Sequence, residues 1–185
     1  GVNLFVIFIQ GGHLNFDEYI PFLKLNTNIF IRSLCLLFAI NSFYVFSAGY
    51  GRDVLAANTI LIEVAMFASM FLEALANVTE SFVARAYVSN DHARLKEVLS
   101  KTLVQCIVST LVLVCVYAIF NQQIISAITS IQSVKLEINK YMIFSILLPM
   151  LASFSYWADG VFVGMLKTVA MRNSMVLALL LYAIL

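Results

Sequence analysis

Residues 141–166 read YMIFSILLPMLASFSYWADGVFVGML, and this stretch carries the strongest structural signal in the chain. Eighteen uncharged residues precede Asp159, and seven more separate it from Lys167. A helix needs about 20 predominantly apolar residues to cross a hydrocarbon core about 30 Å thick. We therefore predict a membrane-spanning helix here, with an acid inside the hydrocarbon and a kink at Pro149.

The composition of the whole chain agrees with this local signal. The chain has 185 residues, of which 62% are hydrophobic and 11% charged, and its mean hydropathy is +0.96. Soluble domains are about 45–50% apolar and about 25% charged. The sequence therefore predicts an all-α, polytopic membrane protein whose solvent is the lipid bilayer. The net charge of +1 gives no basic field for nucleic acid, so we expect no nucleic-acid partner.

Uncharged stretches divide the chain into four complete spans, at about residues 27–49, 54–87, 95–120 and 141–166, and a truncated span from about residue 173. Residues 2–9 are apolar but too few to cross a bilayer. We interpret residues 1–24 as the end of a preceding transmembrane helix followed by a cytoplasmic connection, which extends to about Asn26. Residues 25–185 are then part of a lobe of a longer protein.

Two connections carry local signals of their own. Residues 89–91 (Ser-Asn-Asp) offer side-chain oxygens that can cap the N-terminus of the third span. Residues 121–140 place isoleucines at positions 124, 125, 128 and 131. This spacing predicts a short helix lying in the membrane interface rather than a fifth span.

The basic residues give the chain an orientation. If the spans alternate, eight of them fall on one side and three on the other. The eight are Lys24, Arg32, Arg85, Arg94, Lys96, Lys101, Lys167 and Arg172, and the three are Arg52, Lys135 and Lys140. Cytoplasmic loops carry an excess of Lys and Arg, so we expect the connection before span one to be cytoplasmic.

Acids inside the spans are the first place to look for function, because an ionised side chain near the bilayer centre costs about 2.5–3.5 kcal/mol. Glu73, Asn77 and Glu80 lie within two helical turns of each other on span two and form a polar stripe. Because this span is longer than a bilayer requires, the two glutamates could also simply be solvated beyond the hydrocarbon. Glu63 lies about 80° around the helix from the stripe. It is nearer the non-cytoplasmic end, where it could reach the lipid headgroups.

Asp159 is the strongest single candidate. A carboxyl group inside the hydrocarbon could exchange a proton or a sodium ion as access to it changes. The alternative is an acid satisfied by a hydroxyl or amide of a neighbouring helix. Asn41 on span one is polar but neutral and could equally hold helices together, while Gly160 and Gly164 form a small-residue pair that favours close helix packing.

The sequence contains no pattern typical of an enzyme or a metal centre. It has no GxSxG motif, no phosphate-binding glycine loop and no paired histidines on one helix face. His13 and His92 are 79 positions apart, and the three cysteines lie in separate apolar segments. We expect a protein that is not an enzyme and that has no metal site and no cofactor.

Several segments, in order and spacing, resemble the carboxyl-terminal lobe of multidrug and toxic compound extrusion (MATE) transporters of the DinF branch. The matching segments are residues 25–36, 53–58, 72–86, 159–164 and 171–173. The resemblance implies a partial six-helix bundle from a twelve-helix transporter, with helices seven to ten complete and helix eleven begun. It also implies a bacterial cytoplasmic membrane protein whose amino-terminal lobe belongs to the same polypeptide.

The resemblance further implies an antiporter that exports small organic, often cationic, compounds in exchange for H+ or Na+. Asp159 matches a tenth-helix acid that helps to bind sodium in the NorM branch. That site also uses an acid on the seventh helix, and the chain has no acid between Arg32 and Asp53. The candidates for ion coupling or for the substrate cavity are therefore Asp159, Glu80, Glu73, Asn77 and Asn41, whereas the main coupling aspartate of the DinF branch lies on a first helix outside this chain.

Two other functions stay open. A flippase of lipids or lipid-linked oligosaccharides from the same superfamily would need basic residues inside its spans to handle anionic headgroups. Every Lys and Arg is expected in a connection or near a helix end, which favours the exporter. A non-transporting membrane scaffold subunit would have no need of acids within its spans.

Overall fold

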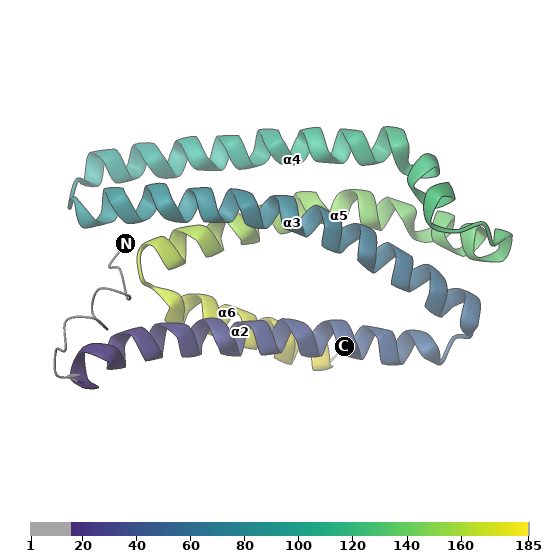
Figure 1. The fold of residues 1–185 in the computed structure, drawn as a ribbon, viewed down its shortest axis with the longest axis horizontal. Coiled ribbons are helices and arrows are strands. Elements are labelled where there is room, and N and C mark those ends of the chain that lie inside the picture. Colours follow the sequence, from purple (N-terminus) through teal and green to yellow (C-terminus); the bar gives the residue numbers. More distant parts are fainter. Residues whose placement is uncertain (1–15, 185) are drawn as a thin grey trace, which may run out of the picture.

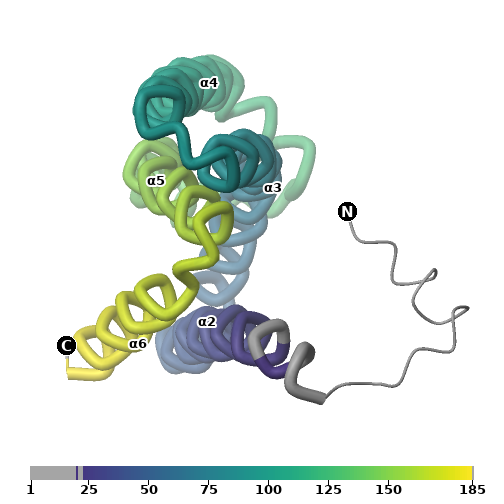
Figure 2. Tube along the Cα trace, turned by 90° about the vertical axis from the view of Figure 1, so that its left-hand side faces the viewer, coloured from purple at the N-terminus to yellow at the C-terminus, as the bar shows by residue number. Residues whose placement is uncertain are grey.

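The computed structural model describes residues 16–184, which form an all-α bundle. The helices are α2 (Phe16–Ala48), α3 (Arg52–Val88), α4 (His92–Ile128), α5 (Gln132–Gly164) and α6 (Thr168–Ile184). They run alternately up and down, so that the α3–α4 and α5–α6 turns lie at one end of the molecule and the other two connections lie at the opposite end (Figure 1). Seen along the helices, α4 forms one side, α3 and α5 the middle, and α2 and α6 the other side (Figure 2).

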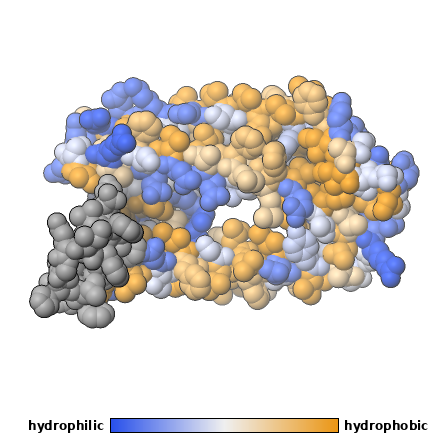
Figure 3. Space-filling model, viewed as in Figure 1, coloured by the Kyte–Doolittle hydropathy of each residue, from blue (hydrophilic) through white to orange (hydrophobic). Residues whose placement is uncertain are grey.

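Four of these helices, α2 to α5, are long and apolar enough to cross a membrane, which confirms the predicted number of complete spans. At 1.5 Å per residue, the 37 residues of α3 extend over about 56 Å, well beyond a hydrocarbon core of about 30 Å. The surface is apolar along much of the length of the bundle and polar toward its two ends (Figure 3). α6 is apolar but has only 17 described residues.

Two helices begin before the predicted membrane spans. α2 begins at Phe16, so it extends through residues 16–26, which belong to the predicted connection. α6 begins at Thr168 rather than near residue 173. Charged residues end a membrane span but not a helix, because outside the hydrocarbon they carry no penalty. The stub predicted at residues 2–9 lies outside the described residues.

The predicted interface helix at residues 121–140 is wrong. α4 continues to Ile128 and α5 begins at Gln132, so only three residues connect them. Ile125 is 1% exposed and packs with Ala57, Val134 and Ile138. Ile124 and Ile125 therefore pack on α3 and α5, whereas Ile128 and Ile131 are exposed, and the last turns of α4 bend toward α5 (Figure 1).

The predicted cap of α4 is confirmed. The side chain of Asp91 accepts a hydrogen bond of 2.9 Å from the backbone N–H of Arg94. This bond satisfies one of the free N–H groups at the helix start. Further along the chain, α5 is continuous through Pro149, which is buried inside the bundle.

The most extensive helix contact in the described part of the bundle joins α3 and α5. A methyl group added at Gly160 would collide with the carbonyl oxygen of Ala76, and one at Gly164 would lie 2.8 Å from the carbonyl oxygen of Glu80. The two glycines therefore let the backbones of α5 and α3 approach more closely than any other residue would permit. The packing role predicted for this pair is confirmed.

Polar side chains tie α4 to the same core. The Tyr117 hydroxyl donates to the carbonyl oxygen of Val64 on α3 at 3.1 Å. The indole N–H of Trp157 on α5 donates to the Thr102 hydroxyl at 3.0 Å. Such bonds hold membrane helices together where hydrocarbon offers no competing partner, so α3, α4 and α5 form one packed unit.

We predict that Gly160→Ala destabilises the protein. In an open helix position, replacing Gly by Ala would stabilise by about 1 kcal/mol. Here the new methyl group meets the backbone of α3, and overpacking of this kind costs about 1–3 kcal/mol. The net effect should be a lower thermal unfolding midpoint of the full-length protein in detergent.

Gly49→Ala is the matched control, because its added methyl group would make only an ordinary contact with the carbonyl oxygen of Phe46. An unchanged midpoint for Gly160→Ala would contradict the packing argument.

Candidate functional site

Asp159 forms an ion pair with Arg32. The guanidinium of Arg32, on α2, donates to the carboxylate of Asp159, on α5. Both side chains lie largely inside the protein, with 25% and 22% of their surfaces exposed. Two opposite charges that neutralise each other avoid much of the cost that either would carry alone inside a membrane.

A second polar contact lies one helical turn away on α2. Asn28 is buried, and its amide nitrogen donates to the Thr168 hydroxyl at 3.1 Å. Its amide oxygen accepts from Arg172 at 3.0 Å. Two successive turns of α2 thus present polar groups, one to α5 and the other to the start of α6.

The turn between α5 and α6 places these partners. Leu166 has a φ of 60°, a conformation that is uncommon for residues other than glycine. The backbone N–H of Lys167 donates to the carbonyl oxygen of Phe162 at 2.8 Å, which closes the end of α5. The turn sends α6 back along α2, its main packing partner, while Asp159 stays on α5.

Arg32 corrects the expectation that every Lys and Arg lies in a connection or near a helix end. Because α2 starts at Phe16, Arg32 lies in the middle of this 33-residue helix. Arg172 is the fifth residue of α6, near the start of that helix, as expected. The absence of basic residues inside the spans therefore no longer counts against a flippase. One sequence signal could have revealed the pair: a single Arg and a single Asp, each alone in an otherwise uncharged span.

The polar stripe on α3 is separate from the ion pair. Glu73 and Asn77 are exposed, and Glu80 is half-buried. Within residues 16–184 their side chains make no hydrogen bond or ion pair, and none of them contacts Asp159 in this way. Asn77 borders a small hollow of about 290 Å3, together with Ser81 and Arg85. Whether these residues take part in transport stays a prediction.

Asn41 also lies apart from the ion pair. Its side chain is exposed, and its amide nitrogen donates to the carbonyl oxygen of Leu37 on the same helix at 2.7 Å. In the described part of the chain this residue does not link α2 to another helix. No three His, Cys, Asp or Glu side chains gather there into a group that could hold a metal ion.

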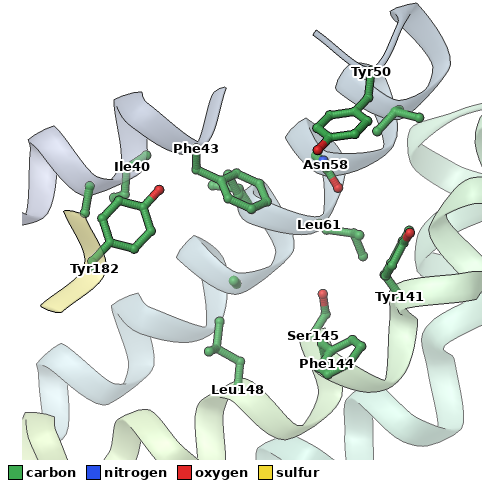
Figure 4. Close-up of a pocket in the computed structure, with 14 residues that line it drawn as sticks. Ile40, Phe43, Tyr50, Asn58, Leu61, Tyr141, Phe144, Ser145, Leu148 and Tyr182 are labelled. Carbon is green, nitrogen blue, oxygen red and sulfur yellow. The ribbon is translucent and has the colours of Figure 1, made fainter. Parts of the chain in front are cut away.

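A larger cavity, of about 790 Å3, lies between the α2–α6 layer and the α3–α5 layer. Its aromatic residues come from α2, α5, α6 and the turn after α2: Phe43, Tyr50, Tyr141, Phe144 and Tyr182. α3 contributes only aliphatic residues and Asn58. In Figure 4 the rings of Phe43 and Tyr182 lie on one side, and Tyr141, Phe144 and Ser145 on the other. An opening between the two layers is also visible in Figure 3. No candidate from the sequence predicted this cavity.

Comparisons with known proteins agree with this architecture. A protein-family model described as MatE matches residues 29–185. The chain is also 30% identical, over 156 residues, to the DNA damage-inducible protein F of Escherichia coli strain K12. That alignment covers 84% of this chain and 34% of the relative, so the chain spans about a third of that protein's length. No solved structure matches the chain significantly.

The family match covers α3 to α6 and most of α2, including both members of the ion pair. It agrees with the helix count, with the apolar surface and with the resemblance carried by the sequence motifs. This chain belongs to the MatE family.

Proposed function

We propose that the chain is part of the carboxyl-terminal lobe of a secondary antiporter in a bacterial cytoplasmic membrane, which exports small organic compounds in exchange for H+ or Na+. The observation that carries the proposal is the Arg32–Asp159 pair inside the membrane-spanning part of the bundle. Family membership supports a transporter. The chain's own residues supply the argument for how ion binding and helix movement are linked.

The ion pair joins two layers that otherwise meet little. α2 packs on α6 and touches α3, but within residues 16–184 its backbone does not approach α5. A proton or sodium ion on Asp159 would weaken its attraction for Arg32. The α2–α6 layer would then be less firmly held to α5, which is the kind of two-state element that ion binding can bias. In this proposal the ion binds to Asp159, and the weaker attraction between Asp159 and Arg32 then loosens the contact between α2 and α5.

The flippase is the second candidate, because Arg32 is a basic residue inside a span. Its charge, however, is paired with Asp159, so the site offers no free cation to an anionic headgroup. A scaffold subunit is less well supported, since it needs neither an intramembrane ion pair nor a cavity. Transport of a fluorescent anionic phospholipid by the full-length protein, without dye export, would favour the flippase.

The first test is dye efflux by the full-length parent protein, which should collapse when the ion gradient is dissipated. Asp159→Asn should lower efflux by at least about tenfold, because asparagine has no carboxylate to take up the coupling ion and leaves Arg32 without its partner. Glu80→Gln should lower it less, since Glu80 is only half-buried and has no ion-pair partner among the described residues.

Asp53→Asn is the matched control for this test. Asp53 is exposed in the first turn of α3, and its substitution should leave efflux unchanged. If Asp159→Asn and Glu80→Gln both leave efflux intact at normal expression, neither residue is part of the coupling site.

A charge swap separates a structural role from a transport role. Arg32→Asp and Asp159→Arg should each lower the thermal unfolding midpoint, because each places two like charges together. The double variant restores attraction between α2 and α5, and its midpoint should recover most of the loss. Efflux should not recover, because the carboxylate has moved from α5 to α2. Recovery of both the midpoint and efflux would show that the pair acts only as a structural link.

A further inference from the structure

Three basic residues come together where α2 and α6 begin. Arg172, on α6, donates from its guanidinium to the amide oxygen of Asn28, on α2, at 3.0 Å. Lys24 lies one helical turn before Asn28 on α2. Lys167 directly precedes Thr168, whose hydroxyl accepts from the amide nitrogen of Asn28 at 3.1 Å. The contacts of one buried asparagine therefore bring a basic cluster to the end of the bundle that carries the α3–α4 and α5–α6 turns (Figure 1).

The basic cluster, formed by Lys24, Lys167 and Arg172, has no carboxylate partner among the side chains that the structure describes. The ion pairs found there involve other basic residues. Lys24 and Lys167 are exposed, and their ammonium groups make no hydrogen bond to a described residue. Like charges that are held close together repel one another. An anion placed among the three would be attracted by all of them and would relieve this repulsion.

The guanidinium of Arg172 is held in one orientation by two neutral amides. Its Nη1 donates to the side-chain oxygen of Asn28, and its Nε and Nη2 donate to that of Asn173 at 3.1 and 2.8 Å. Asn28 is only 6% exposed, so its position is set by the packing of α2 on α6. A guanidinium has five N–H groups, and these bonds use three of them. The other two can donate to an anion, and phosphate oxygens are favourable acceptors for arginine.

Exposed apolar side chains lie beside the same cations. Leu23 precedes Lys24, Leu166 precedes Lys167, and Val169 lies in the first turn of α6. All three apolar side chains are more than half exposed. A phospholipid combines the two matching chemistries, because its phosphate suits the cations and its acyl chains suit the apolar surface that continues along the bundle (Figure 3). Basic pockets between membrane helices on the cytoplasmic side bind anionic headgroups, and the distribution of basic residues predicts that this end is cytoplasmic.

From these observations we infer that the basic cluster at the start of α2 and α6 binds the phosphate headgroup of an anionic phospholipid. The phosphate accepts from the two remaining N–H groups of Arg172 and attracts the ammonium groups of Lys24 and Lys167. These residues belong to α2, to the α5–α6 turn and to α6, so the bound lipid also holds these segments together. The inference goes beyond the proposed transport function, since lipid binding at this place does not depend on what the protein carries.

Native mass spectrometry of the full-length protein tests this inference. The purified protein is mixed with equal amounts of dioleoyl phosphatidylglycerol and dioleoyl phosphatidylcholine, which have the same acyl chains but differ in headgroup charge. Wild type should retain phosphatidylglycerol at least about tenfold more than phosphatidylcholine, a difference of about 1.4 kcal/mol in binding. A triple variant that combines Lys24→Gln, Lys167→Gln and Arg172→Gln should lose this preference.

A second triple variant is the matched control. It combines Arg85→Gln, Arg94→Gln and Lys96→Gln, which remove the same number of charges at the same end of the molecule. These three residues are exposed and lie on α3 and α4, which do not pack on α6 in the described part of the chain. Figure 2 shows α4 on the opposite side of the bundle from α2 and α6. The control should keep the preference for phosphatidylglycerol.

Thermal unfolding in detergent gives a second measurement that does not require the variants to be equally stable. A ligand that binds only the folded protein raises its unfolding midpoint. Added phosphatidylglycerol should therefore raise the midpoint of wild type and of the control variant, whereas phosphatidylcholine should not. The variant without the basic cluster should not respond to phosphatidylglycerol, whatever its own midpoint is.

Three results would overturn the inference. Equal retention of the two lipids by wild type would mean that the headgroup is not recognised. Loss of the preference in both triple variants would mean that the total charge of this end, rather than the basic cluster, selects the lipid. A midpoint that rises with inorganic phosphate, without preferential retention of phosphatidylglycerol, would identify a soluble phosphate group as the ligand.

Discussion

The contact between α3 and α5 at Gly160 and Gly164 determines where the rest of the bundle can lie. Any larger residue at these positions would meet the α3 backbone, so the two helices are held at one separation and one rotation. Asp159 directly precedes Gly160, and its direction is therefore fixed by the same contact. With α5 seated on α3, its carboxylate is presented to α2, where Arg32 meets it. The packing contact thus positions the ion pair.

Hydrocarbon around the bundle explains why so many of its cross-links are polar. Apolar side chains gain little by leaving lipid for protein, so close packing and interhelical hydrogen bonds carry helix association. Tyr117 and Trp157 bind α4 to α3 and α5 in this way. Asn28 does the same between α2 and α6. The first set joins three helices into a unit, and the second joins the remaining two. The Arg32–Asp159 ion pair links these two units, as does the hydrogen bond from Asn58 on α3 to Ser47 on α2.

Features set by composition and local pattern could be predicted from the sequence. Four spans, the cap at Asp91 and the glycine contact all depend on residues that are close in the chain or on one helix face. The errors have a common cause. The start of α2 and the burial of Ile125 depend on what the segment packs against, and hydropathy cannot distinguish water, lipid and protein as neighbours. Arg32 and Asp159 are 127 positions apart, and a pairing at that distance follows from the helix arrangement, which residue spacing does not reveal.

The acids predicted inside the spans fall into two groups in the structure: Asp159, which is paired with Arg32, and the glutamates on α3, which have no ion-pair partner among the described residues. The charge of Asp159 is balanced by Arg32, and none of the described residues that line the cavity is charged. Glu73 and Asn77 lie on an exposed face of α3 and have no such partner in the described residues. An ionised side chain at the bilayer centre costs about 2.5–3.5 kcal/mol. A carboxylate paired with an arginine avoids much of this cost, whereas an unpaired carboxylate does not. The pairing with Arg32 holds α5 to α2, whereas an unpaired acid needs water or protein beside it. The Arg32–Asp159 pair and the polar stripe on α3 are therefore stabilised in different ways.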